Sequence, residues 1–118
     1  GWSRANEQRS FSLFARGRYG EKEINADLFD DVDYQTFQSF VLRNSGQDWL
    51  RTGFKDLALT RLMAGSGIDV QAGRPSVVYL NGEYWGTYNL REKVNEHFLA
   101  TKHNLSPDEI DIVEANGV

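Results

Sequence analysis

The fold is decided by residues 79–94, YLNGEYWGTYNLREKV, which predict a β-hairpin. Asn81-Gly82 is the strongest short hairpin signal, because both residues tolerate the positive φ angles of a type I′ turn. Apolar and aromatic residues on either side predict one strand over 74–80 and a return strand over 83–91. With a two-residue turn, three cross-strand pairs are expected: Tyr79 with Tyr84, Val78 with Trp85, and Val77 with Gly86.

The return strand runs into three consecutive charges, Arg91-Glu92-Lys93. Continued alternation places Glu92 on the apolar face of the strand and Arg91 on the opposite face. A carboxylate on an apolar face needs exposure to water or a cationic partner, for which Arg9 and Arg43 are the candidates. On these residues alone, an ordinary ion pair at the sheet edge is favoured over a ligand site.

The rest of the chain predicts an α+β fold, with a mostly antiparallel sheet and two helices. Further strands are expected over 9–16 and 37–43, where aromatic and β-branched residues gather. Residues 24–29 predict a short strand or an irregular segment, and residues 110–113, IDIV, alternate as a last strand.

The longer helix is expected over 49–64, with Asp48 as its N-cap. Its buried stripe follows from the 3.6-residue spacing of Leu50, Phe54, Leu57, Ala58 and Leu62. Asp56 and Thr60 are expected to lie away from that stripe, and Gly65 and Gly67 to end the helix. A second helix is expected over 94–103, and Ser106-Pro107-Asp108-Glu109 predicts a single capped turn.

Composition limits the classes of function. The 118 residues suit one domain, and 40 % hydrophobic and 13 % aromatic residues supply a core. A net charge of −4 disfavours nucleic-acid binding, and no apolar run is long enough to span a membrane. There is no cysteine, so no disulfide or thiolate metal site is expected. Because the first residues lack an initiator Met and the last ones read as a strand leading into a turn, we expect the chain to be cut from a longer protein.

Other candidate sites have simpler interpretations. His97 and His103 are six residues apart, which does not suit a zinc site. The acidic run over 27–33 lacks the spacing of a calcium loop, so a solvated loop is favoured and no metal ligand is assigned. The large aromatic residues are expected to pack in the core and hairpin in preference to forming a sugar-stacking platform. They are Trp2, Trp49, Tyr84, Trp85 and Tyr88.

Four segments together resemble the CotH family, which is named for a bacterial spore-coat protein. They are GWSRANEQRSFSLFARGRYG, FVLRNSGQDW, KDLA and RPSVVYLNGEYWGTYNLREKVNEHFL. They occur in the family's order and cover nearly the whole chain. The last block, residues 74–99, is the most specific, because it combines a hairpin pattern with the helix that follows.

The resemblance implies the smaller, N-terminal lobe of an atypical protein-kinase-like fold. Members of the family use ATP and a divalent metal, here taken as Mg²⁺, to phosphorylate secreted or coat proteins in bacteria. Residues 1–118 would be a single domain, namely this lobe and the hinge, with the helix over 49–64 as its regulatory helix. The larger lobe would be missing, so the chain alone is expected to be inactive and to expose a face through which it could form a homodimer. A secreted or spore-associated location follows from the family.

The resemblance also implies site residues. Phosphates need a cation oriented by a carboxylate. Arg9 or Arg43 would supply the cation, although family members often carry Lys in place of Arg9, and Asp56 or Glu92 the carboxylate. The adenine would lie against the hinge, with Glu92, Lys93 and Asn95. The alternative is a non-catalytic module that grips a protein or a glycan through Tyr84, Trp85 and Trp49.

Overall fold

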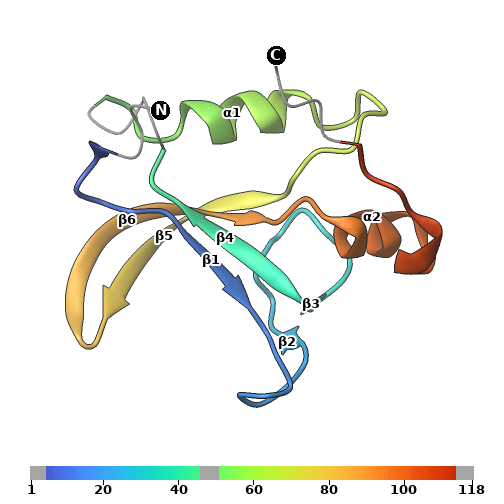
Figure 1. Ribbon diagram of the computed structural model, residues 1–118. Helices are drawn as coiled ribbons and strands as arrows, with labels where there is room; N and C mark the ends of the chain where they lie inside the picture. The colour runs from blue at the N-terminus through green and yellow to red at the C-terminus, as the bar shows by residue number, and fades with distance from the viewer. Residues whose placement is uncertain (1–4, 46–50, 114–118) are drawn as a thin grey trace.

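The computed structural model describes residues 5–45 and 51–113, which form an α+β fold (Figure 1). A four-stranded antiparallel sheet has the order β1-β4-β6-β5. Its strands are β1 (Phe11–Phe14), β4 (Ser39–Arg43), β5 (Gly73–Leu80) and β6 (Glu83–Glu92). A two-stranded ribbon pairs β2 (Ile24–Asn25) with β3 (Thr36–Phe37). The helices are α1 (Lys55–Leu62), α2 (Glu96–His103) and the 3₁₀ turn η3 (Pro107–Glu109).

Different layers cover the two faces of the sheet. Figure 1 shows α1 above the sheet and the β2–β3 ribbon below it. On the lower side, Phe29, Phe37, Ala72 and Leu90 form the buried core cluster. The rings of Phe29 and Phe37 meet edge to face, with centroids 5.4 Å apart. The core therefore lies between the sheet and the 26–37 segment, while the upper face is left for α1.

The hairpin has the expected turn but a different register. Asn81 and Gly82 have positive φ angles of 50° and 80°, and Tyr79 pairs with Tyr84 as predicted. Beyond that pair a β-bulge shifts the register, so Val78 pairs with Gly86 instead of Trp85, and Val77 with Thr87. The physical cause is Gly86, because its φ of +123° suits a β-bulge and is an angle that residues with a side chain rarely adopt.

The first helix is confirmed, but its predicted face is wrong. It begins at Lys55, and Phe54 is its N-cap without a side-chain hydrogen bond, whereas Asp48 lies outside the described residues. Leu57 is buried at 4 % exposure, yet Phe54 and Leu62 are exposed. Thr60 and Asp56 instead point toward the sheet, because the strands below offer charged partners to this face. The helix ends before Gly65 and Gly67, as predicted.

Outside the hairpin, two predicted strands are shorter than expected and one, over residues that the structure describes, is absent. The strand predicted over 9–16 covers Phe11–Phe14, and the one predicted over 24–29 covers only Ile24–Asn25. The predicted strand over 110–113 is wrong, because these residues are irregular and mostly exposed. Alternation alone does not make a strand when no partner edge is beside it.

The second helix and the capped turn are confirmed. Asn95 is the N-cap of α2, and its side chain accepts a hydrogen bond from the Phe98 N–H at 3.0 Å. In η3 the Ser106 N–H donates to the Glu109 carboxylate at 3.0 Å, which is half of the expected capping box. Within the described ranges, neither helix has the length and apolar character needed to cross a bilayer.

Candidate functional site

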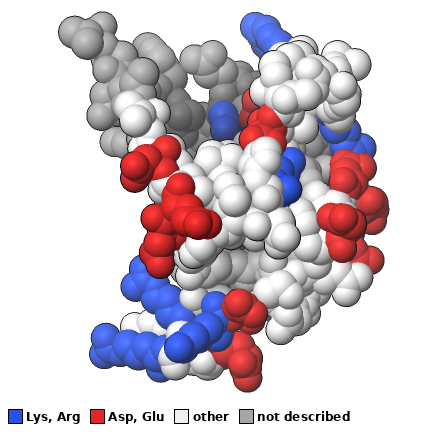
Figure 2. Space-filling model, turned by 90° about the vertical axis from the view of Figure 1, so that its right-hand side faces the viewer, with Lys and Arg blue, Asp and Glu red and all other residues white. Residues whose placement is uncertain are grey.

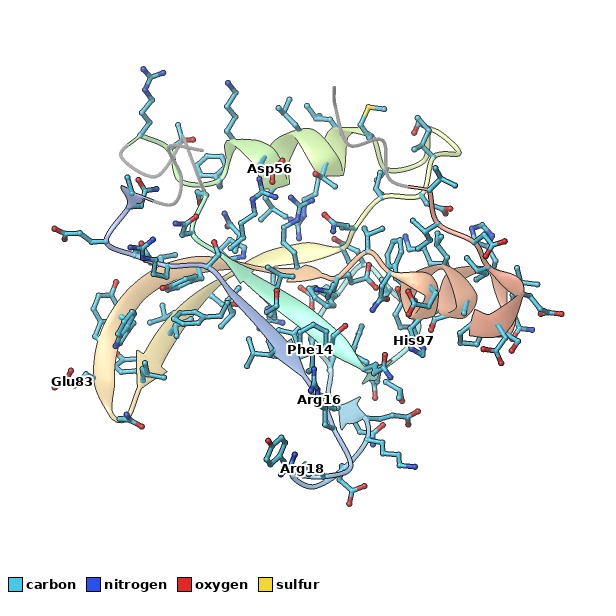
Figure 3. All side chains as sticks on the ribbon, viewed as in Figure 1. Phe14, Arg16, Arg18, Asp56, Glu83 and His97 are labelled. Carbon is cyan, nitrogen blue, oxygen red and sulfur yellow. The ribbon has the colours of Figure 1, made fainter. Side chains whose placement is uncertain are left out.

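A charged cluster is centred on Asp56, in the first turn of α1 (Figure 3). Arg91 of β6 donates a hydrogen bond from Nη1 to Asp56 Oδ2. Arg43, at the end of β4, places its Nε 3.4 Å from the same oxygen. Arg91 also donates from Nη2 to Thr60 Oγ1 at 2.8 Å, one turn further along the helix. One carboxylate therefore holds two guanidinium groups from neighbouring strands.

The two arginines differ in access to water. The Arg91 side chain is 5 % exposed and the Arg43 side chain 50 % exposed. Arg91 Nε is buried and has no hydrogen-bond partner in the described part of the chain. Arg91 therefore fixes Asp56 from beneath, whereas the guanidinium of Arg43 faces water and has donors left for an incoming anion.

Glu92 lies on the opposite face and is bound by neutral donors. The Tyr34 hydroxyl donates to Glu92 Oε1, and the Ala72 N–H donates to Oε2 at 2.8 Å. Of the two candidate partners for Glu92, Arg9 and Arg43, Arg43 is wrong, because it pairs in register with Asn89 and so shares the face of Arg91. A buried carboxylate with two strong donors is a structural clamp between β6 and the 26–37 segment.

The environment of Glu92 also affects Tyr34. Burial raises the pKa of the Tyr34 hydroxyl well above its ordinary value, and the hydrogen bond to Glu92 and the nearby charges of Glu92 and Asp33 raise it further. The tyrosine therefore stays protonated and remains the donor in this pair through neutral and mildly alkaline pH.

Residues 93–95 connect the sheet to α2 and carry the other predicted site residues. The Lys93 Nζ lies 4.6 Å from the centre of the Phe14 ring. Asn95 uses its side-chain oxygen to cap α2, and its Nδ2 lies 3.4 Å from Ser39 Oγ. The hollow beside them is about 30 Å³, room for about one water. It is too small to hold a nucleotide base.

A larger hollow opens on the α1 side of the sheet. Its volume is about 390 Å³, within the usual size of a small-molecule site. Arg91 and Val94 line it from below, and Leu59 and Met63 line it from α1. Of the Asp56 cluster, Thr60 and Arg91 line this hollow, whereas Asp56 and Arg43 do not. The hollow therefore extends from Arg91 to Val94 in the connection after β6, and it has both apolar walls and charge.

The structure brings together only some of the predicted residues. Arg43 and Asp56 meet, whereas Glu92 lies on the other face of the sheet. Arg9 is exposed and precedes β1, outside the elements that build the Asp56 cluster.

Three further residues take part and were not predicted as site residues: Tyr34, Thr60 and Arg91. The sequence contained patterns that indicate Arg91 and Thr60. The alternation along β6 already placed Arg91 opposite the apolar face, and Asp56 and Thr60 are four residues apart on one helix face. No sequence pattern indicated Tyr34, because it is 58 residues from Glu92.

The described residues fit a phosphate better than a metal ion. In the ranges 5–45 and 51–113, no three His, Asp or Glu side chains gather as a metal site. Asp56 is already engaged by arginines, and Asp30 and Asp31 lie near Arg74 and Arg61. Mg²⁺ is usually held by one or two carboxylates together with water and substrate phosphates, so these ion pairs with arginine make the three aspartates less suited to it. The exposed guanidinium of Arg43 has the donor geometry that a phosphate group accepts.

Comparisons with known proteins agree with the sequence. The family model described as CotH kinase protein matches residues 1–117. Neither the curated proteins nor the solved structures gave a match. Nearly the entire chain is thus accounted for by one family.

Proposed function

Because the chain belongs to the CotH kinase family, we propose that it forms the nucleotide-binding small lobe and hinge of an ATP-dependent protein kinase. One observation carries the proposal: Asp56 on α1 holds the strand cations Arg43 and Arg91, and Arg91 lines a hollow of about 390 Å³. A cation on the sheet, oriented by a carboxylate on a helix, is the arrangement by which protein kinases hold ATP phosphates.

The order of the elements supports the same proposal. α1 lies in sequence between β4 and β5, and β6 pairs between these two strands in the sheet. The chain leaves β6 through residues 93–95 and enters α2 directly. In this proposal β5 and β6 are the last two strands of the lobe, and residues 92–95 are the hinge.

Each residue has a distinct role in the proposed site. Arg43 contacts the phosphates, Asp56 orients Arg43, and the buried Arg91 fixes Asp56. The base lies against the backbone of 92–95 on the side of the larger hollow, which Val94 lines. The Asn95 side chain is engaged as a helix cap, and Lys93 flanks the connection. Glu92 secures the start of the hinge to the core.

Catalysis requires parts that the described residues do not provide. Phosphoryl transfer depends on metal ions and a positioned base. We propose that a larger lobe in a longer protein supplies the positioned base and holds Mg²⁺. We also propose that the protein substrate is a secreted or spore-coat protein of a bacterium. The chain alone would then bind nucleotide weakly and transfer no phosphate.

The test is a titration of a fluorescent ATP analogue with Mg²⁺ into the longer protein and its Arg43→Ala variant. We expect affinity to fall at least about tenfold, because a charge-assisted hydrogen bond contributes ~1.5–3 kcal/mol. Arg51→Ala is the matched control, since Arg51 is also an exposed arginine but lies before α1. Equal affinity in the Arg43 and Arg51 variants would remove Arg43 from the site.

A non-catalytic glycan-binding module is the second candidate, and exposed tyrosines favour it. Tyr79 and Tyr84 lie side by side on the hairpin, both well exposed, with ring centroids 5.8 Å apart. Trp85, by contrast, packs edge-on against Phe11. The two tyrosine rings are inclined at 68°, which gives a sugar no continuous flat surface. Binding to a glycan array that is lost in Tyr84→Ala would favour this candidate over the kinase lobe.

A further inference from the structure

The connection between β1 and β2, residues 15–23, carries the basic residues Arg16, Arg18 and Lys22 and the acidic residues Glu21 and Glu23. Arg16, Arg18 and Lys22 are all exposed there. Figure 3 shows Arg16 and Arg18 at the lower end of the molecule, away from α1 and Asp56. Figure 2 shows Lys and Arg side chains gathered at the same end. We call Arg16, Arg18, Lys22 and Lys93 the basic patch.

Aromatic rings hold the cations of the basic patch in place. Two of them contact the Phe14 ring: Lys93 Nζ lies 4.6 Å and Arg16 Cζ 5.6 Å from its centroid. Arg18 Cζ lies 5.7 Å from the Tyr19 ring, which is 81 % exposed. Cation–π contacts orient these groups without neutralising them.

The remaining cation, Lys22, lies on the same connection as the two arginines. Its side chain passes close to Gly17, where an added Cβ would lie 3.0 Å from Lys22 Cγ. The basic patch thus combines three cations of the β1–β2 connection with Lys93, which follows β6.

The basic patch differs from most of the other arginines because it has no ionic partner. Arg43, Arg61, Arg74 and Arg91 each pair with an aspartate. Across residues 5–45 and 51–113, no carboxylate forms an ion pair with a member of the basic patch. The chain carries 17 acidic and 13 basic residues, so unpaired basic groups are not the result of a shortage of acids. Four cations that form no ion pair attract an anionic partner, and Glu21 and Glu23 on the same connection reduce this attraction only in part.

We propose that the basic patch is a docking surface for an acidic polypeptide segment, one rich in Asp and Glu with an occasional aromatic residue. Glu21 and Glu23 interrupt the loop with negative charge, and the whole chain has a net charge of −4. A continuous phosphate backbone would be repelled by both, whereas a peptide can place separate carboxylates on the cations. The exposed faces of Phe14 and Tyr19 offer contact area for an aromatic side chain of the same peptide. This surface meets the proposed nucleotide site at Lys93, which flanks the connection after β6, whereas Arg16, Arg18 and Lys22 lie between β1 and β2.

The experiment is a fluorescence anisotropy titration with labelled hexaglutamate, run on the chain and on two variants. Arg16→Glu/Arg18→Glu reverses two charges of the basic patch, and Arg51→Glu reverses one exposed charge before α1. We expect the first variant to bind at least about tenfold more weakly and the control to stay within about twofold, because only nearby charges are felt through ~10 Å of screening. Wild-type binding should also weaken as NaCl is raised.

Three results would overturn the proposal. They are no measurable binding of hexaglutamate at low salt, equal binding by the Arg16/Arg18 variant, and tighter binding of an oligothymidine with the same number of charges. Far-ultraviolet circular dichroism of both variants establishes that they remain folded. A lysine peptide of equal length and opposite charge serves as the control ligand. Nucleotide affinity is not used in this test, so its outcome is independent of the proposed kinase function.

Discussion

Arg91 shows how one buried side chain can hold the other groups of a site in position. It bonds both Asp56 and Thr60 from below, and its own side chain is 5 % exposed. We predict that Arg91→Ala lowers the free energy of unfolding by about 2 kcal/mol, since hydrogen bonds to charged groups contribute ~1.5–3 kcal/mol. Urea denaturation would measure the change.

Arg43→Ala is the control for this prediction. Because Arg43 is half-exposed, Arg43→Ala should lower the free energy of unfolding by less than about 1 kcal/mol, as is usual for an exposed ion pair. A larger stability loss for Arg43→Ala than for Arg91→Ala would contradict the assignment of a structural role to Arg91 and a ligand role to Arg43.

Tyr34 makes the stability of the fold sensitive to alkaline pH. Removing its hydroxyl with Tyr34→Phe leaves Glu92 Oε1 buried without this donor, and should cost about 1–3 kcal/mol at neutral pH. Burial, the hydrogen bond to Glu92 and the nearby negative charges raise the pKa of Tyr34 in the folded state. In the unfolded chain Tyr34 ionises near its ordinary value of about 10.

The sign of the pH effect follows from these two states. Above about pH 10 the unfolded state releases the Tyr34 proton while the folded state retains it, so stability falls as pH rises. We therefore predict that the stability advantage of wild type over Tyr34→Phe is constant up to about pH 9 and shrinks above pH 10. Thermal unfolding of both proteins across that range is the measurement, and a gap that widens with pH would contradict the prediction.

At the scale of elements, the β-bulge of the hairpin depends on Gly86. Its φ of +123° is unfavourable for any other residue, and an added Cβ would lie 2.8 Å from Gln8 Nε2. Gly82 also has a positive φ, but nothing lies within 4 Å of a Cβ there. We predict that Gly86→Ala destabilises the protein by about 1 kcal/mol more than Gly82→Ala does, because strain and a steric contact add together. Equal costs would mean that Gln8 simply moves aside.

The sequence predicted the kinds of elements better than their faces. The hairpin strands, both helices and the Asn81-Gly82 turn were predictable because each has a local signal, whereas the alternation of residues 110–113 predicted a strand that does not form. The bulge was not, because a glycine in a strand indicates irregularity without stating its direction. The face of α1 was also missed. Leucine spacing favoured an apolar stripe, yet the sheet presents Arg43 and Arg91 to the helix, so Asp56 and Thr60 turn inward. Such a choice depends on tertiary contacts that the helix sequence does not contain.

The same limit applies to the site. Arg43 and Asp56 were predicted as site residues from the family resemblance and from their positions on a strand and a helix. In the structure these two side chains lie together. The expected pairing of Arg43 with Glu92 failed, because register decides which face of the sheet a residue occupies. Tyr34 could not be predicted, since its contact with Glu92 joins segments that are distant in sequence.

In the whole molecule, α1 and its C-cap carry exposed apolar side chains. They are Leu59, Leu62 and Met63, with Leu62 at 79 % exposure. Such a surface favours self-association when no other domain covers it. We predict that the chain forms a homodimer through this surface, and that Leu59→Glu/Leu62→Glu is monomeric.

Sedimentation velocity over a range of concentrations tests this expectation. Leu105→Glu is the control, because Leu105 is also exposed but follows α2. A wild-type chain that stays monomeric throughout, or a dimer that persists in the Leu59/Leu62 variant, would contradict it.

The central claim is that this lobe binds nucleotide at the Asp56 cluster and the connection after β6. The most direct measurement is a nuclear magnetic resonance titration of the ¹⁵N-labelled chain with ATP and Mg²⁺, which detects even weak binding. The account predicts that amide shifts concentrate at Arg43, at Arg91 and in residues 93–95. Shifts confined to the 79–84 end of the hairpin, or no shifts at millimolar nucleotide, would contradict it.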